Sequence, residues 1–315
     1  MKICTYYLND KKKDLIGVLL NNKILNLNVF FGEIILKDLI VIPNWKAKVE
    51  ECIKENLNDL ISLNQVSLKA PIPIPTSFRD AYAFRQHVET SRRNRGVDMI
   101  KEFDDFPVFY FSNHNAIYGP NEDIKCMPEH FEKLDYELEF AIVIGKEGEN
   151  ISAKNAGEYI AGYMILNDIS ARGLQMKEMK LNLGPAKGKD FASVLGPYLV
   201  TPDELEKNIV SKNDLGTKFD LKMSCYVNGH LLSSGNTKEM YWSFEQIIER
   251  ISYGVKLFPG DIIGSGTVGK GCLLEINGTN KLANLNYKEQ WLKNGDIISM
   301  KIDQLGEIEN KIIRK

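Results

Sequence analysis

The chain has 315 residues, of which 43% are hydrophobic and 26% charged, as is ordinary for a globular protein. Its 40 basic and 42 acidic residues nearly cancel, so charge gives no reason to expect nucleic acid or an anionic membrane as a partner. The five cysteines are scattered without a Cys-x-x-Cys pair or a Cys/His cluster, so neither zinc nor a disulfide framework is expected. With no leader-like start and no apolar run of membrane-spanning length, the sequence predicts a cytoplasmic protein.

Residues 1–70 are expected to form a small N-terminal domain that contains β-strands. Alternating apolar residues predict strands at 4–8, 15–20 and 24–27, with a charged turn at 9–13 and an Asn-Asn turn at 21–22. Helical spacing predicts a helix over 45–61, with Val49, Cys52, Ile53 and Leu57 on one face. The unit carries no clustered titratable groups, so we expect it to be a scaffold or to support a dimer.

Alternate prolines at positions 71, 73 and 75 exclude a helix and mark the boundary to a second domain, residues 71–315. Strands dominate there after residue 135. A hairpin is expected at Asn228-Gly229, and capping boxes predict helix starts at Thr201 and Ser243. No Walker loop occurs, and the glycine-rich run 264–271 lacks the ending that a phosphate loop needs. The pattern favours a mainly β, α+β fold over a doubly wound α/β sheet.

An acidic strand at 135–145 is the first candidate site. In an extended strand Leu138 and Phe140 share one face while Glu137 and Glu139 share the other, about 7 Å apart. Acidic groups so placed repel one another unless water or a cation relieves them, although wet strand faces often carry such acids without a ligand. Asp135 is on the same face, but the strand rise puts it about 13 Å from Glu139, so we expect it to lie outside a shared site.

Further polar groups follow in 167–190. Asp168 comes after a hydrophobic strand, and Arg172 and Gln175 are spaced to lie on adjacent turns of a helix that starts near residue 170. Lys189 follows Gly188, which permits close backbone approach. A ligand set made only of oxygen atoms indicates Mg²⁺, with Ca²⁺ or Mn²⁺ as alternatives.

Of the four histidines, His87 is the candidate for catalysis because Asp80, Tyr82 and Arg85 precede it closely. A base of this kind needs a carboxylate to orient it, and Glu275 is a candidate. The highly charged residues 88–106 fit either a solvated surface helix or a helix and loop above a site.

Five motifs together resemble the fumarylacetoacetate hydrolase superfamily, in order and spacing. They are DAYAFRQH at 80–87, YELE at 136–139, NDISAR at 167–172, LGPAKGKDF at 183–191 and GSGT at 264–267. The resemblance runs from about residue 75 to the C-terminus. It implies a β-roll catalytic domain of the fumarylacetoacetase type, a homodimer and a small-molecule oxo-acid substrate.

The resemblance also implies roles for individual residues. The metal would be held by Asp80, Glu137, Glu139 and Asp168. His87 would be the general base and Glu275 its orienting partner, while Arg172, Gln175 and Lys189 would stabilise oxyanion charge. Tyr82, Tyr110, Gln175 and Thr267 would contact the substrate.

The implied reaction is hydrolysis of a carbon–carbon bond in a fumarylacetoacetate- or acylpyruvate-like diketo acid, by water that His87 activates. A decarboxylase, hydratase or dehydratase of a 2-oxo acid is the alternative on the same scaffold, and a non-catalytic metal-binding protein is a third. Two departures from the tyrosine-degrading fumarylacetoacetases put their substrate in doubt. Met179 stands where those enzymes carry a tyrosine, and Gly96 where they carry an arginine, so Arg92, Arg93 or Arg95 would have to bind the substrate.

Overall fold

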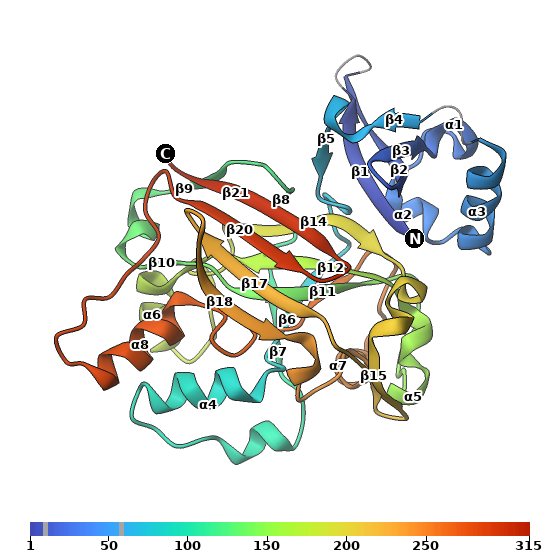
Figure 1. Ribbon diagram of the computed structural model, residues 1–315. Coiled ribbons are helices and arrows are strands. Elements are labelled where there is room, and N and C mark those ends of the chain that lie inside the picture. Colours follow the sequence, from blue (N-terminus) through green and yellow to red (C-terminus); the bar gives the residue numbers. More distant parts are fainter. Residues whose placement is uncertain (9–11, 57–59) are drawn as a thin grey trace.

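The computed structural model describes residues 1–8, 12–56 and 60–315 (Figure 1). Two sheets carry most of the strands, as the predicted mainly β, α+β class requires. The larger sheet runs in the order β4 (Leu60–Ser62), β3 (Lys23–Asn26), β2 (Lys13–Leu20), β1 (Lys2–Leu8), β14 (Ser193–Val200), β12 (Ile160–Asp168), β11 (Leu138–Ile144), β19 (Ile262–Gly264), β6 (Phe78–Ala81) and β7 (Phe109–Ser112), with β5 (Val66–Lys69) on β1 and β8 (Ile117–Tyr118) on β14.

The second sheet packs across the first and has the order β18 (His230–Asn236), β17 (Lys222–Val227), β20 (Ile297–Ile302), β21 (Gly306–Arg314) and β9 (Ile124–Cys126). Two small pairs complete the strands: β10 (Leu134–Asp135) with β13 (Ser170–Ala171), and β15 (Ile209–Asn213) with β16 (Gly216–Phe219).

The helices are short and cover the sheets' edges and ends. They are α1 (Asn28–Phe31), α2 (Leu36–Leu39), α3 (Trp45–Glu55), α4 (Arg85–Arg93), α5 (Ala153–Ala156), α6 (Arg172–Met179), α7 (Phe244–Ile251) and α8 (Leu273–Ala283). Short 3-10 turns join them: η1 (Leu63–Gln65), η2 (Lys101–Asp104), η3 (Pro128–Glu132), η4 (Gly157–Tyr159), η5 (Pro202–Asn208) and η6 (Thr237–Glu239). None of the helices in the described ranges is long and apolar enough to cross a membrane.

The central strand β11 is buried on both faces. Phe140 and Ile142 point into the core shared with the second sheet, whereas Ala141 and Val143 pack into a separate core toward the N-terminal strands. Successive side chains of β11 therefore alternate between the two faces, as the sequence predicts, but neither face is exposed to solvent. An acid on this strand must consequently be paired, protonated or bound to a cation.

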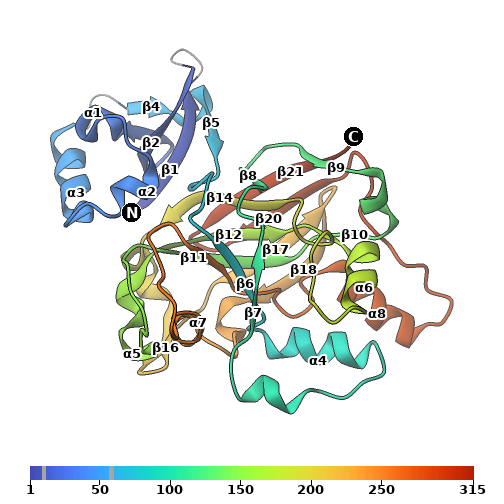
Figure 2. The same cartoon turned by 180° about the vertical axis from the view of Figure 1, so that it is seen from behind.

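The N-terminal unit continues the larger sheet. Strand β1 pairs antiparallel with β14, with Lys2 opposite Val200 and Ile3 opposite Leu199, and Figure 2 shows the unit standing to one side of the second sheet. The predicted helix over 45–61 is too long, because α3 ends at Glu55 and the chain returns as β4 at Leu60 to pair with β3. Residues 9–11 of the predicted turn, and Leu57 of the predicted helical face, lie outside the described residues.

The two predicted capping boxes have different outcomes. At Ser243 the hydroxyl accepts from the Gln246 backbone N–H at 3.1 Å, and the helix that follows buries Ile247, Ile248 and Ile251 as expected. At Thr201 the prediction is wrong. The Thr201 hydroxyl bonds to the amine of Met1 and makes no side-chain cap, and only the 3-10 turn η5 follows.

Candidate metal centre and catalytic dyad

Acidic side chains from three strands of the larger sheet, β6, β11 and β12, lie close together. Asp80 is the last residue but one of β6, Glu137 immediately precedes β11, Glu139 is the second residue of β11, and Asp168 ends β12. Strand β19 separates β6 from β11, and Gly264 pairs with both Asp80 and Ala141. A Cβ atom at Gly264 would lie 2.3 Å from Asp80 Oδ1, so glycine is needed there for the two acidic strands to share one site.

Three of these carboxylates fit a cation. One oxygen from each of Asp80, Glu137 and Glu139 lies within 4.8 Å of the other two, and all three residues are buried. Glu139 Oε1 accepts from the Thr267 hydroxyl at 3.3 Å, whereas Glu139 Oε2 is buried with no partner among the described residues. A buried carboxylate oxygen without a donor is costly, and an all-oxygen donor set suits a hard divalent cation. These residues therefore fit the divalent metal that the sequence predicts.

The charge balance of the site supports the same conclusion. Five buried carboxylates, those of Asp80, Asp135, Glu137, Glu139 and Asp168, face two buried cations, Arg172 and Lys189. Three negative charges are thus uncompensated when all the acids are ionised. Burial, then the charge of Asp168, raises the pKa of Asp80 to about 7, and burial followed by Asp80 raises the pKa of Glu139 well above its usual value.

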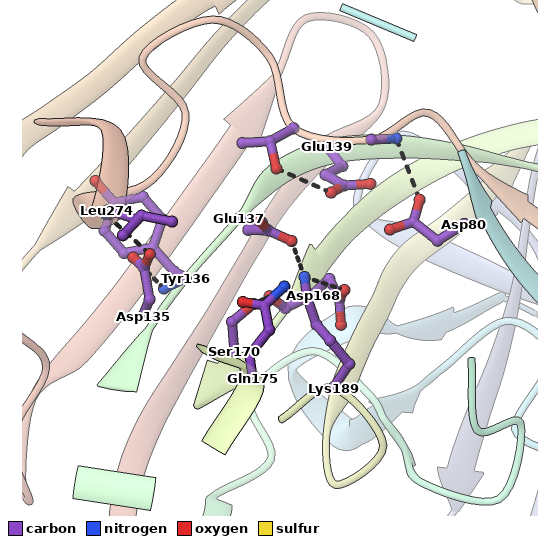
Figure 3. A network of polar contacts seen from close by, with 12 residues as sticks. Asp80, Asp135, Tyr136, Glu137, Glu139, Asp168, Ser170, Gln175, Lys189 and Leu274 are labelled. Carbon is purple, nitrogen blue, oxygen red and sulfur yellow. Dashed lines mark hydrogen bonds and ion pairs between the residues drawn. The ribbon is translucent and has the colours of Figure 1, made fainter. Parts of the chain in front are cut away.

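Lys189 lies between two of the predicted metal ligands. Its ammonium donates to Glu137 Oε2 and, at 2.6 Å, to Asp168 Oδ2. Burial alone would raise the pKa of Glu137, but Arg172 and Lys189 outweigh it and hold that pKa below its usual value. Of the Asp80, Glu137 and Glu139 carboxylates, Glu137 is therefore the one whose ionised form the protein stabilises, and Figure 3 shows its contact with Lys189.

Asp168 is held by protein donors. The Tyr110 hydroxyl donates to Asp168 Oδ2 at 2.6 Å and lies 3.3 Å from Asp80 Oδ2, and the Ser193 hydroxyl is 3.4 Å from Asp168 Oδ1. Asp168 thus adjoins the three-carboxylate group through Lys189 and is not within it. Its role as a fourth ligand, and the contact of Tyr110 with substrate, stay predictions.

Asp135 faces away from this group, as expected (Figure 3). The reason is a change of partner strand: β10 ends at Asp135, and β11 begins only at Leu138. Asp135 accepts from Arg172 Nε at 2.8 Å and from the backbone N–H groups of Leu273 and Leu274, so it anchors the start of α8. Asp135 therefore lies outside the shared site, as predicted, but the prediction that it lies on the same strand face as Glu137 and Glu139 is wrong.

Each guanidinium nitrogen of Arg172 donates to a protein group. Besides Asp135, Arg172 donates to Glu137 Oε1 at 2.7 Å and to Gln175 Oε1 at 2.9 Å. Arg172 and Gln175 do share one face of α6, as their spacing predicts. The hydrogen bond from Arg172 fixes the Glu137 carboxylate. For Arg172 to stabilise an oxyanion, as predicted, the substrate would have to compete with these protein acceptors for the guanidinium N–H groups.

His87 and Glu275 meet although 188 positions separate them. His87 Nδ1 lies 2.7 Å from Glu275 Oε2, with both residues buried, because α4 and α8 pack against each other. The ring of Tyr82 contacts the imidazole edge-on, with 5.6 Å between ring centroids. The pairing occupies Nδ1, and His87 Nε2 makes no hydrogen bond to any residue that the structure describes. The structure thus forms the pair that a histidine base needs, and its catalytic role stays a prediction.

A cavity of about 910 Å³ opens over the carboxylates and His87. Four helical and loop segments form its walls: α4, α6, α8 and residues 100–110. Of the three candidate arginines, Arg92 and Arg95 line this cavity, while Arg93 lines a different hollow between α4 and α8. All of the predicted substrate-contacting residues line it: Tyr82, Tyr110, Gln175 and Thr267.

Gly188 positions Lys189, and its replacement gives a first test of the site. A Cβ atom there would lie 2.7 Å from Cα of Gln175, which confirms the expected close backbone approach. Gly188→Ala is expected to push α6 away and lower both turnover and melting temperature, because backbone cannot yield as a side chain can. Gly157→Ala, where the nearest atom is 3.8 Å away, is the matched control. Equal melting temperatures for both variants would contradict this reading.

Cys272 is a further residue of this site, and the sequence does not single it out. This residue precedes α8, and its backbone bridges that of Glu137. Its thiol lies in the same small group as Glu137 and His87, which corrects the expectation that no cysteine and histidine cluster. The only signal in the sequence is its position three residues before Glu275.

Comparison with known proteins agrees with these motifs. The family model for the C-terminal domain of fumarylacetoacetate (FAA) hydrolase matches residues 76–313. The chain belongs to the fumarylacetoacetate hydrolase family. It is 32% identical over 258 residues to oxaloacetate tautomerase YisK of Bacillus subtilis, covering 80% of this chain and 75% of that protein. It is 29% identical to a fumarylacetoacetate hydrolase domain-containing protein 2 homolog of Dictyostelium discoideum, over 99% and 97% of the two chains.

Solved structures of this family share the fold. Fumarylacetoacetate hydrolase from Exiguobacterium antarcticum superposes with a TM-score of 0.73 at 24% identity, covering all of both chains. Maleylpyruvate hydrolase from Sphingobium sp. SYK-6, in complex with manganese(II) and pyruvate, gives a TM-score of 0.71 at 21% identity, covering 100% of this chain and 99% of that one. The fumarylacetoacetase-like fold expected from the motifs is thus confirmed.

Proposed function

We propose that this protein is a divalent-cation-dependent hydrolase that cleaves a carbon–carbon bond in an acylpyruvate- or fumarylacetoacetate-like diketo acid. The observation that carries the proposal is the His87–Glu275 pair, buried at 2.7 Å beside the Asp80–Glu137–Glu139 group. Hydrolysis needs a base to activate water, whereas a group that only binds a metal needs none. The metal-containing maleylpyruvate hydrolase of the same fold is consistent with this chemistry.

A bound Mg²⁺ or Mn²⁺ would polarise adjacent substrate oxygens and stabilise enolate charge. Asp80, Glu137 and Glu139 would hold it, with Asp168 beside them. Lys189 and Arg172 keep Glu137 ionised for that task. The surplus negative charge of the metal-free site would favour binding of a divalent ion.

The chain's own residues would carry out the proton transfers. His87 Nε2 takes a proton from water, while Glu275 holds the imidazole at Nδ1 and stabilises its charged form. The hydroxide adds to the acyl carbonyl, and the electron pair of the broken carbon–carbon bond passes to the pyruvate enolate. The CH₂ carbon of this enolate then takes up the proton that His87 holds, so that an acylpyruvate yields pyruvate and a carboxylic acid. Gln175 and Lys189, which line the cavity, would stabilise the oxyanion, and Lys189 would do so in competition with its contacts to Glu137 and Asp168.

The walls of the cavity favour an acyl group of some length. Met176, Met179 and Leu282 line it outside the carboxylates. Cavities of about 300–1,000 Å³ enclose ligands far larger than a four-carbon acid. Arg92 and Arg95 line the same cavity and would bind a carboxylate of the substrate.

A second candidate function is oxaloacetate tautomerase activity, which the name of the Bacillus subtilis relative supports. It uses the same parts: a base that moves a proton between carbon and oxygen of a chelated 2-oxo acid. Decarboxylation or dehydration of a 2-oxo acid would proceed from the same enolate.

A substrate panel separates these functions. We expect acetyl-, butanoyl- and hexanoylpyruvate to be cleaved, with kcat/KM rising about fourfold for each CH₂ buried, since each contributes about 0.8 kcal/mol. Fumarylacetoacetate, oxaloacetate and sugar-derived 2-oxo acids complete the panel, and EDTA should abolish turnover. Rapid enol–keto exchange of oxaloacetate without cleavage of any diketo acid would refute hydrolysis in favour of tautomerisation.

A further inference from the structure

A buried thiol adjoins both the dyad and the carboxylate group. Cys272 Sγ, one oxygen of Glu137 and one nitrogen of His87 lie within 4.8 Å of one another, and all three residues are buried. The backbones of Glu137 and Cys272 form an antiparallel bridge, so the main chain itself fixes the spacing of these two side chains.

The thiol of Cys272 differs from the other buried thiols. Those of Cys4, Cys126 and Cys225 each donate to a backbone carbonyl oxygen, at 3.5–3.9 Å. Cys272 Sγ makes no hydrogen bond of this kind within residues 1–8, 12–56 and 60–315, and it is fully buried. An unpartnered sulfur that lies beside an imidazole and a carboxylate is a donor without an acceptor.

The imidazole is already oriented as it is in zinc sites. A histidine that binds a metal through one nitrogen usually donates from the other to a carboxylate, which fixes its tautomer and ring plane. His87 Nδ1 has this arrangement with Glu275 Oε2 at 2.7 Å, so Nε2 is the nitrogen that a cation would bind. Sulfur, imidazole and carboxylate together form the mixed donor set that Zn²⁺ prefers, unlike the all-oxygen group beside it.

We propose that Cys272, His87 and Glu137 form a site for a thiophilic divalent cation such as Zn²⁺, and that its occupation inhibits the enzyme. The cation would occupy the free nitrogen of His87 and displace the thiol proton to solvent. It would also take up Glu137, which the all-oxygen group needs, so that hard and soft cations compete through one shared ligand. The inhibition rests on the proposed role of His87 as base, whereas the site itself does not.

Cobalt(II) tests the site without any reaction. Co²⁺ added to the metal-free protein should give a near-ultraviolet thiolate-to-cobalt absorption band with one ion per chain, and Zn²⁺ should abolish the band. In Cys272→Ser the band should be missing, while Cys52→Ser, which removes a half-buried thiol on α3, should keep it. A Co²⁺ spectrum of the unaltered protein without a thiolate band overturns the site, and this arm needs no variant to fold.

Zinc titration during turnover tests the inhibition. Each rate is expressed relative to the zinc-free rate of the same variant. Cys272→Ser should need more Zn²⁺ for half-inhibition than Cys52→Ser. The difference should exceed about 10–100-fold, which is the typical loss of affinity when a residue that only supports a metal ligand is removed. Raising Mg²⁺ should relieve the inhibition, because Glu137 is shared. Equal zinc sensitivity in the two variants overturns the proposal. Should no diketo acid or oxaloacetate be converted at all, the proposed function fails while the cobalt spectrum still decides the site.

Discussion

His87→Gln is expected to reduce turnover of the diketo acid by about 10²–10⁴-fold while leaving Mg²⁺ affinity nearly unchanged. Glutamine retains an N–H that can donate to Glu275, so the buried carboxylate is not left without a partner. It has no basic nitrogen, so water is no longer activated. The oxygens that fit the metal come from Asp80, Glu137 and Glu139, none of which hydrogen-bonds to His87.

Steady-state kinetics on the best substrate of the panel, with calorimetry for Mg²⁺, measures both quantities. His230→Gln is the matched control, since His230 is exposed at the start of β18. Glu275→Gln should share the kinetic defect in part, because it removes only the charge that stabilises the imidazolium. Full activity in His87→Gln would refute the assignment of the base, and loss of Mg²⁺ binding would show instead that His87 supports the metal.

The chemistry of the site could be predicted from the sequence where groups lie close along the chain. The DAYAFRQH and YELE motifs identify His87 and the acidic residues, and residues 167–190 supply Asp168, Arg172 and Lys189. The β-rich class and the caps and turns at Ser243 and Asn228 follow from local rules, since Asn228 and Gly229 both adopt the positive φ of a type I′ turn.

What could not be predicted depends on which strands become neighbours. The sequence does not reveal that β19 lies between β6 and β11, or that Gly264 must be glycine there for Asp80 to reach Glu139. Nor does it show the break between Asp135 and Leu138, which turns Asp135 to Arg172, or the bridge that brings Cys272 to Glu137. Thr201 does not cap a helix because its hydroxyl oxygen accepts a hydrogen bond from the amine of Met1, which is distant in the sequence. Each of these contacts is set by tertiary pairing that local propensity does not encode.

Glu139→Gln is expected to have opposite effects on the metal-free and the metal-loaded protein. Without metal, the variant should be more stable than the original chain, because it removes one charge from a buried group in which carboxylates outnumber cations. The cause is visible in Glu139 itself: burial and the charge of Asp80 raise its pKa well above the usual value, which means that its ionised form destabilises the fold. With metal, the variant should lose one of three oxygen ligands. Removal of a residue that only supports a ligand typically lowers metal affinity by about 10–100-fold, so Mg²⁺ affinity should fall here by at least that much.

Thermal unfolding with and without Mg²⁺ reveals both effects in one experiment. At a Mg²⁺ concentration 100 times its Kd, the unaltered protein should gain about 2.7 kcal/mol, which corresponds to about 4 °C in Tm for a chain of this size. Glu139→Gln should start from a higher Tm in EDTA and show little rise with Mg²⁺, whereas Glu206→Gln, an exposed acid on η5, should behave like the original chain. An unchanged Mg²⁺-dependent shift in Glu139→Gln would exclude Glu139 as a ligand. A lower Tm in EDTA would show that the protein instead stabilises this carboxylate, through its hydrogen bond from Thr267.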